Sequence, residues 1–231
     1  MSATMKQANL TGGQQRLLSR FSEAGGVVEF VFFDCGGVAS EERIHHAAVL
    51  LGLKEIQRRT DDYAERTSKE TGITKSRIFQ INIDNGVAKK LAPRRVTWRE
   101  FLGPRYDFNR GGLIVRGKGD FLNEFFFYHD QSMRENIIPP DRIDYGIGTG
   151  FAYAFSSPPY GMHLSAEQIG EMFNKFLQFI IGGSDESLIY EWPIDWSNYF
   201  DAGQEWWGSF LWSMSNPGDT RIVVIAASTT D

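Results

Sequence analysis

Residues 209–228 read SFLWSMSNPGDTRIVVIAAS and predict the β-hairpin around which the fold is built. In its first half, Phe210, Trp212 and Met214 alternate with positions that include Ser209, Ser213 and Ser215, which is the period of a strand that buries one face. The turn Asn216-Pro217-Gly218-Asp219 places proline and glycine where a type II turn requires them. Residues 221–227 form the returning strand, so we expect a hairpin over about 206–228.

The stretch 165–181, SAEQIGEMFNKFLQFII, predicts an amphipathic helix that packs against this hairpin. Ser165 and Gln168 form a capping box at its start, and Gly182-Gly183 supplies the stop. The large apolar residues recur at the i, i+3, i+4, i+7 spacing of one helical face: Ile169, Met172, Phe173, Phe176, Leu177, Ile180 and Ile181.

Along the rest of the chain, helices and hairpins do not alternate strictly, which favours an α+β fold with a mixed or mainly antiparallel sheet. Helical patterns cover 14–23, 41–53 and 54–69, and strand patterns cover 27–33, 112–116, 124–128 and 151–155. Residues 76–84 have a strand period and precede Asn85-Gly86, the preferred pair for a type I′ hairpin turn. We expect one α+β domain over 1–231, with a basic N-terminal lobe (about 1–118) and an acidic aromatic C-terminal lobe (about 119–231) as an alternative subdivision.

The composition is that of a folded protein, with 42% of 231 residues apolar and 23% charged. Collagen-like, coiled-coil and low-complexity architectures are excluded. Cys35 is the single cysteine, so one chain forms no disulfide bond and no cysteine metal site, which favours a reducing compartment. Because there is no apolar signal segment and no apolar run near the ~20 residues that span a bilayer, we expect a cytoplasmic protein without membrane contact.

Charge is divided unevenly along the chain. Residues 1–42 carry a net charge of −2, residues 43–118 carry +9, and residues 119–231 carry −12. Such a division is typical of two halves that neutralise each other by packing, of an acidic face for a basic protein partner, or of a basic face for nucleic acid. These three interpretations stay open on charge alone.

Two short stretches resemble functional motifs of known families. The first, VFFDCGGV at residues 31–38, places Asp34 at the end of a buried strand and resembles the first motif of haloacid dehalogenase-like phosphohydrolases. The resemblance implies that Asp34 is a carboxylate nucleophile on phosphorus and that a late acidic pair, for which Asp185 and Glu186 are candidates, holds Mg²⁺. The repeating strand–helix units of that family are missing, and a strand that ends in an Asp-Gly turn explains the same residues.

The second stretch lies within residues 64–83, at TGITKSRI (residues 71–78) and Ile81. It resembles the turn and recognition helix of helix-turn-helix repressors, which implies a glycine in the turn and a second helix in the DNA major groove. The basic residues nearby would supply phosphate contacts. The competing interpretation is a helix followed by a turn and a strand, because residues 79–83 alternate between apolar and polar.

Apart from these two resemblances, no motif predicts a cofactor or a metal. His45 and His46 are adjacent, so on a helix their side chains point about 100° apart, and His129 and His163 are isolated in sequence. The phosphate loops GxxxxGK[ST] and GxGxxG are absent, as is the nucleophile motif GxSxG. We therefore predict no cofactor, no metal and no catalytic residues.

The most unusual stretch is residues 191–212, EWPIDWSNYFDAGQEWWGSFLW, which holds five of the six tryptophans and no lysine or arginine. Tryptophans are enriched at binding hot spots, and carboxylates around them steer a basic partner. The competing interpretation is that these aromatic residues form the core beneath the hairpin. The candidate binding residues are Trp192, Asp195, Trp196, Asp201, Glu205, Trp206 and Trp207.

These patterns together favour a non-catalytic cytoplasmic module that binds a basic protein through an acidic aromatic C-terminal surface, as inhibitors and immunity-type proteins do. The alternative is a helix-turn-helix DNA-binding regulator that uses residues 64–83, and a third is a phosphohydrolase with Asp34 as nucleophile. Nucleic acid is thus the second choice of partner. The binding interpretation requires exposed tryptophans, because a residue wholly in the core cannot touch a partner.

Overall fold

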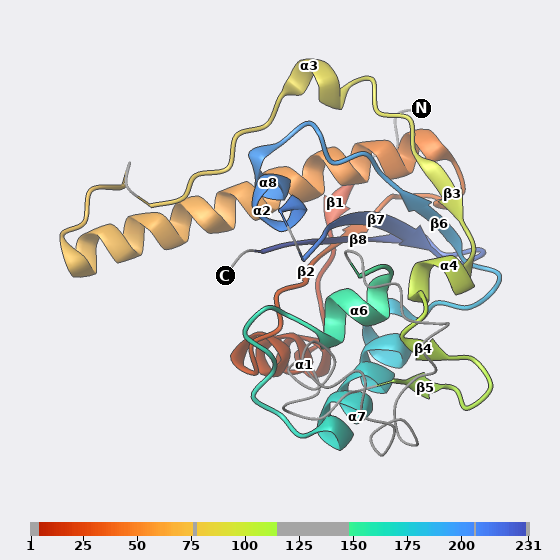
Figure 1. Cartoon of the computed structure of the whole chain (residues 1–231). Helices are drawn as coiled ribbons and strands as arrows, with labels where there is room; N and C mark the ends of the chain where they lie inside the picture. The colour runs from red at the N-terminus through yellow and green to blue at the C-terminus, as the bar shows by residue number, and fades with distance from the viewer. Residues whose placement is uncertain (1–4, 76–77, 115–147, 206, 230–231) are drawn as a thin grey trace.

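The computed structural model describes residues 5–75, 78–114, 148–205 and 207–229, which form a six-stranded antiparallel sheet between layers of helices (Figure 1). The strand order is β1-β2-β8-β7-β6-β3. A separate two-stranded sheet pairs β4 with β5. The strands are β1 (Lys6–Gln7), β2 (Glu29–Asp34), β3 (Arg94–Val96), β4 (Tyr106–Asp107), β5 (Gly112–Leu113), β6 (Leu188–Glu191), β7 (Ser209–Ser215) and β8 (Arg221–Ser228). The predicted α+β class with a mainly antiparallel sheet is confirmed.

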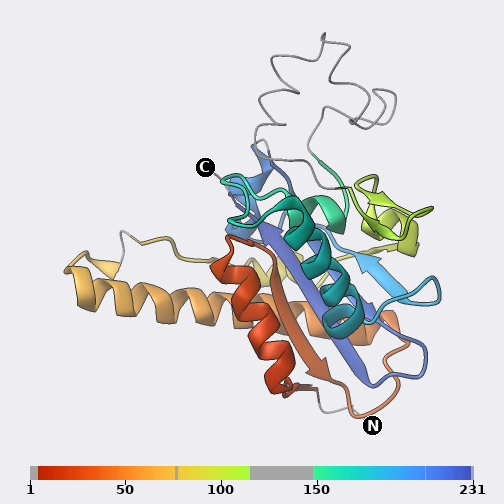
Figure 2. The same ribbon diagram turned by 90° about the horizontal axis from the view of Figure 1, so that it is seen from below.

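Helices cover both faces of the large sheet. The long helix α2 lies on one face, and α1, α6 and α7 lie on the other (Figures 1 and 2). The helices are α1 (Gly12–Glu23), α2 (Glu42–Thr71), α3 (Asn85–Ala88), α4 (Trp98–Leu102), α6 (Phe151–Ser156), α7 (Ala166–Phe176), the π-helical turn η4 (Leu177–Ile181), the 3₁₀ turn η5 (Asn198–Phe200) and α8 (Asp201–Gln204). Strands from the first and last thirds of the chain lie side by side in one sheet.

The C-terminal hairpin forms as predicted and occupies the centre of the sheet. Strand β8 lies between β2 and β7, and Gly218 has φ of 79°, the left-handed value that the third position of a type II turn requires. The amide of Asp219 donates to the carbonyl oxygen of Asn216 at 3.1 Å and closes the turn.

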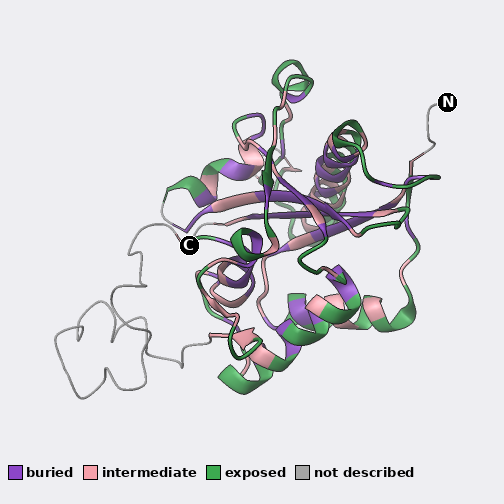
Figure 3. Cartoon of the chain, turned by 90° about the vertical axis from the view of Figure 1, so that its right-hand side faces the viewer, coloured by how far each residue is buried: buried purple, intermediate pink, exposed green. Residues whose placement is uncertain are grey.

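Strand β8 is buried on both faces, which explains its continuous apolar run. Because successive side chains of a strand point to opposite faces, Val223, Ile225 and Ala227 enter the core beneath α1, α6 and α7, whereas Ile222, Val224 and Ala226 enter the core beneath α2. Figure 3 shows buried residues along the strands and exposed residues on the outer faces of the helices.

The amphipathic stretch 165–181 is helical and faces the core, as predicted. The capping box is present: the Ser165 side chain accepts from the amide of Gln168 at 3.2 Å. The last turn widens into a π-helix, which breaks the expected regular helix, and the side-chain amide of Gln14 donates to the carbonyl oxygen of Phe179 at 2.8 Å there. The five predicted core positions are all buried, at Ile169, Met172, Phe173, Phe176 and Ile180.

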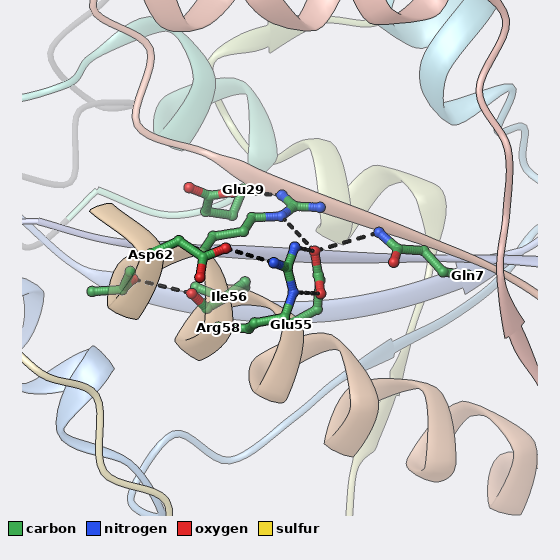
Figure 4. A network of polar contacts seen from close by, with 8 residues as sticks. Gln7, Glu29, Glu55, Ile56, Arg58 and Asp62 are labelled. Atoms are coloured by element: carbon green, nitrogen blue, oxygen red, sulfur yellow. Dashed lines mark hydrogen bonds and ion pairs between the residues drawn. The ribbon is translucent and has the colours of Figure 1, made fainter. Parts of the chain in front are cut away.

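Residues 41–69, expected as two helices, form the single helix α2 of 30 residues. The helix continues through Gly52. The missing Cβ of this residue lets the helix lie close to strand β8, because a Cβ there would lie 2.9 Å from a methyl group of Val224. Ion pairs fix the same helix to the sheet (Figure 4). Glu55 accepts from Arg58 Nε at 2.8 Å and from Arg59 Nε at 3.0 Å, and Arg59 also donates to Glu29 on β2 at 3.2 Å. The hydrogen bond from Arg58 is the largest cause that lowers the pKa of Glu55 to about 2, and Arg59 adds to it.

A polar network lies inside the core beneath α2. His45 is 0% exposed, and its Nδ1 lies 2.9 Å from the hydroxyl oxygen of Ser213. Its Nε2 lies 3.1 Å from the Ser215 hydroxyl oxygen and 3.3 Å from the carbonyl oxygen of Ala39. Because a carbonyl oxygen only accepts hydrogen bonds, Nε2 of His45 carries the proton, and Nδ1 accepts from the hydroxyl of Ser213. The oxygen of that hydroxyl also accepts from the indole N–H of Trp192 at 2.8 Å. Burial lowers the pKa of His45 to about 4, so the imidazole is neutral in the folded protein.

Three predicted elements are wrong. Residues 151–155 form helix α6 and not a strand, since a short apolar run has no distinguishing period and its two alanines favour a helix. Residues 78–84 form no strand beyond one bridge, between Ile83 and Ser197. Asn85-Gly86 opens helix α3 and not a hairpin, because the Asp84 side chain accepts from the amides of Gly86 and Val87 and caps that helix. The strand expected at 124–128 lies outside the described residues.

Candidate functional site

Three of the candidate tryptophans belong to the core. Trp192, Trp196 and Trp207 are 3%, 1% and 1% exposed, so the prediction that they form a binding surface is corrected. Each indole N–H has an internal acceptor: the Ser213 hydroxyl for Trp192, the Pro193 carbonyl for Trp196 and the Ser157 carbonyl for Trp207. Large aromatic side chains fill the space between sheet and helices, which is why burial prevails over exposure here. Trp206 lies outside the described residues.

The carboxylates of the same stretch remain on the surface. Asp195, Asp201 and Glu205 are exposed and lie within residues 195–205, which we call the acidic segment. In the described parts of the chain, no lysine or arginine lies within ion-pair distance of any of the three. Arg94 pairs with Glu191, outside this segment, at 2.8 Å. The acidic segment is therefore not neutralised by the described basic residues.

A helical arm projects from the sheet. Beyond Ile56, helix α2 continues for another 15 residues, and of these only Ala64 is buried. Figures 1 and 2 show this end of α2 extending past the edge of the sheet. Pairs of opposite charge at i, i+4, Arg58 with Asp62 and Glu65 with Lys69, support the exposed helix. We call α2 residues 58–71 the arm.

Residues 78–84 follow the arm in the chain and contact the acidic segment, and we call them the return. Three large apolar side chains on the arm and after it are exposed, Tyr63 at 58%, Ile73 at 47% and Phe79 at 55%. Three hydrogen bonds join the return to residues 196–198. The amide of Asp84 donates to the carbonyl oxygen of Trp196 at 2.8 Å. The Ser197 hydroxyl donates to the Asn82 carbonyl oxygen at 2.8 Å, and the Asn198 side-chain amide donates to the Gln80 carbonyl oxygen at 3.0 Å. Exposed aromatic residues and exposed carboxylates thus occur on neighbouring segments, although the tryptophans do not supply them.

Residues 78–84 do not form the second helix that the helix-turn-helix interpretation requires. Helix α2 ends at Thr71 and is capped by Gly72, whose φ of 72° fits the expected glycine turn. No second helix follows in residues 78–84, which run extended beside the base of the arm, where the Gln57 side-chain amide donates to the carbonyl oxygen of Ile81 at 2.6 Å. Ile81 is buried against the core and is not available as part of a recognition helix.

Asp34 lies at the end of β2, as expected, but its surroundings are those of an antiparallel sheet, with Lys6 of β1 on one side and Arg221 of β8 on the other. It is half-exposed and lies 3.4 Å from Arg221 of the antiparallel neighbour β8. Cys35 beside it is buried, and burial raises the pKa of its thiol. Among the described residues, no group of three or more histidine, cysteine, aspartate or glutamate side chains is placed to hold a metal ion.

A cavity of about 580 Å³ opens beside the edge strand β3, and the sequence analysis did not anticipate it. Its apolar lining comes from Val96 and Trp212 of the large sheet, from Tyr106 of β4 and from Phe108, which follows β4. Arg94 and Arg99 supply cations. The only sequence signal is an excess of basic residues over 89–110, seven against two acidic ones, at Lys89, Lys90, Arg94, Arg95, Arg99, Arg105 and Arg110.

Comparison of the chain with models of protein families, with curated proteins and with solved structures finds no match. None of the described helices is both long enough and apolar enough to cross a bilayer.

Proposed function

We propose that this chain is a non-catalytic binding protein that takes a basic protein partner on the acidic segment and the adjoining arm. The observation that carries the proposal is the exposure of Asp195, Asp201 and Glu205 without a cation from the described part of the chain. Unneutralised carboxylates on a surface raise the association rate with a basic partner and disfavour acidic ones.

The way the acidic segment is held also supports the proposal. Buried Trp196 and Phe200 anchor it from below, and Asn198 is bonded on both sides of its amide to the return from the arm. A surface held by packing and hydrogen bonds loses little conformational entropy when a partner binds. On the arm, Tyr63 adds an exposed aromatic side chain of the kind that contributes most to interfaces.

The test is affinity capture from a lysate of the source cells, compared between variants and quantified by mass spectrometry. The test variant neutralises the acidic segment, with Asp195→Asn, Asp201→Asn and Glu205→Gln. The control removes the same number of exposed carboxylates elsewhere, with Glu171→Gln on α7 and Asp185→Asn and Glu186→Gln before β6.

We expect basic proteins that the wild type and the control retain at low salt, with about tenfold lower yield on the test variant. Retention should also fall as salt rises, because exposed charges are screened. Tyr63→Ala should reduce the yield of the same proteins. Equal capture by wild type and test variant, or an equal loss in the control, would refute the proposal, since only net charge would then matter.

A further inference from the structure

The cavity beside β3 has a rigid aromatic floor and walls. Trp212 is 2% exposed, its ring stacks on Phe210 at 5.2 Å between centroids, and it meets Phe101 edge-on at 5.4 Å. Tyr106 and Phe108 contact each other edge-to-face at 4.8 Å. Side chains packed in this way keep their positions, so the apolar part of the cavity is preformed. Its volume of about 580 Å³ is within the range of sites for small molecules, roughly 300–1,000 Å³.

The two arginines that line the cavity differ in their ion pairs with carboxylates. Arg94 is neutralised twice, by Glu100 at 2.8 Å and by Glu191 at 2.8 Å. The Glu100 carboxylate also accepts hydrogen bonds from the amide and the hydroxyl of Thr97, at 2.7 and 2.8 Å. The carboxylates that line the cavity are therefore already engaged with partners of their own.

Arg99 has no such partner among the described residues. Its guanidinium lies over the ring of Phe108, 4.1 Å from the centroid, and no carboxylate of the described residues lies within ion-pair distance. A guanidinium with its face on a ring still has N–H donors along its edge, and these match a carboxylate in bidentate geometry. The basic excess of residues 89–110 adds a field that attracts anions to the same edge of the sheet.

We propose that the cavity binds a small aromatic carboxylate, with its ring against Tyr106 and Phe108 and its carboxylate on Arg99. The apolar lining takes the ring through burial of its surface, and Arg99 supplies the charge-assisted hydrogen bonds that select an anion. This site is separate from the acidic segment, so it stands or falls independently of the proposed protein partner.

The test compares phenylacetate with its uncharged analogue phenylacetamide on the full chain, by calorimetry and by ¹H–¹⁵N spectra. In the spectra, the amide signals of Gly103 and Gly150, which line the cavity, report the location of binding. The test variant is Arg99→Gln. The matched control is Arg110→Gln, which removes an exposed arginine of the same region that does not line the cavity.

We expect wild type and Arg110→Gln to prefer phenylacetate by about 10-fold or more, the value of one charged hydrogen bond, with shifts at the two glycines. Arg99→Gln should abolish the preference while its urea-unfolding midpoint stays unchanged, because Arg99 is exposed. Equal binding of the two probes to the wild type, no binding of either, an undiminished preference in Arg99→Gln, or shifts confined to other parts of the chain would overturn the proposal.

Discussion

Acidification from pH 7 to pH 5 should destabilise this protein through the buried side chain of His45. The folded protein holds the imidazole neutral, with Nδ1 accepting from Ser213 and Nε2 donating towards Ala39. A second proton would go to Nδ1, which would then have to donate where it now accepts. Burial opposes the same charge and lowers the pKa of His45, while the hydrogen bond to Ala39 acts in the opposite direction.

The magnitude follows from the pKa of His45 in the two states. The pKa is about 4 in the folded protein, against 6.5 for an exposed histidine, and each unit of difference is worth about 1.4 kcal/mol, so the full effect is about 3 kcal/mol. Between these two values the unfolded chain binds one more proton than the folded protein. The unfolding free energy therefore has its full value above pH 6.5 and falls with pH down to about 4, by about 1 kcal/mol per pH unit midway.

The assay is urea unfolding at a series of pH values between 7.5 and 5, followed by the fluorescence of the buried tryptophans. Wild type should lose about 2 kcal/mol over this range, and His45→Gln, although less stable at pH 7.5, should lose much less. His46→Gln, on the same helix, is the control for the loss of an imidazole and should keep the wild-type slope. A wild type whose stability is constant from pH 7.5 to 5, or an unchanged slope in His45→Gln, would refute the reasoning. An NMR titration of the His45 ring in the folded wild type checks the same pKa without any substitution.

Three further substitutions test the packing. Phe173→Ala, at the centre of the core beneath α7, should lower the unfolding free energy by about 3–5 kcal/mol in urea titrations, through lost burial and the cavity left behind. Gly52→Ala should destabilise by about 1–3 kcal/mol, although alanine favours helices, because the new methyl group meets Val224; a gain in melting temperature would contradict this. Glu55→Gln should cost about 1 kcal/mol at pH 7, and its gap to wild type should narrow as pH falls from 4.5 towards 2, where the carboxylate with the lowered pKa protonates in the folded state.

Local chemistry was sufficient to predict the hairpin and the helix at 165–181. In the hairpin, the two-residue period and the Pro217-Gly218 turn act within a few residues of each other, and helix α7 has its cap and its apolar stripe in one segment. Residues 151–155 lack such signals. A run that is apolar on every side carries no period, so its packing between the sheet and α7, together with the helix propensity of its two alanines, decides that it is a helix.

The candidate sites depended on tertiary structure for the same reason. The sequence by itself determined that residues 191–212 combine tryptophans with carboxylates, but burial separates the two kinds of side chain: the rings enter the cores and the acids stay in water. The cavity shows the limit most clearly, since Trp212, Tyr106 and Arg99 come from three separate segments. Residues far away in the chain decide whether a side chain is buried or exposed. They also decide whether the N–H groups of an arginine have an acceptor within the protein. Only the folded structure brings these residues into contact.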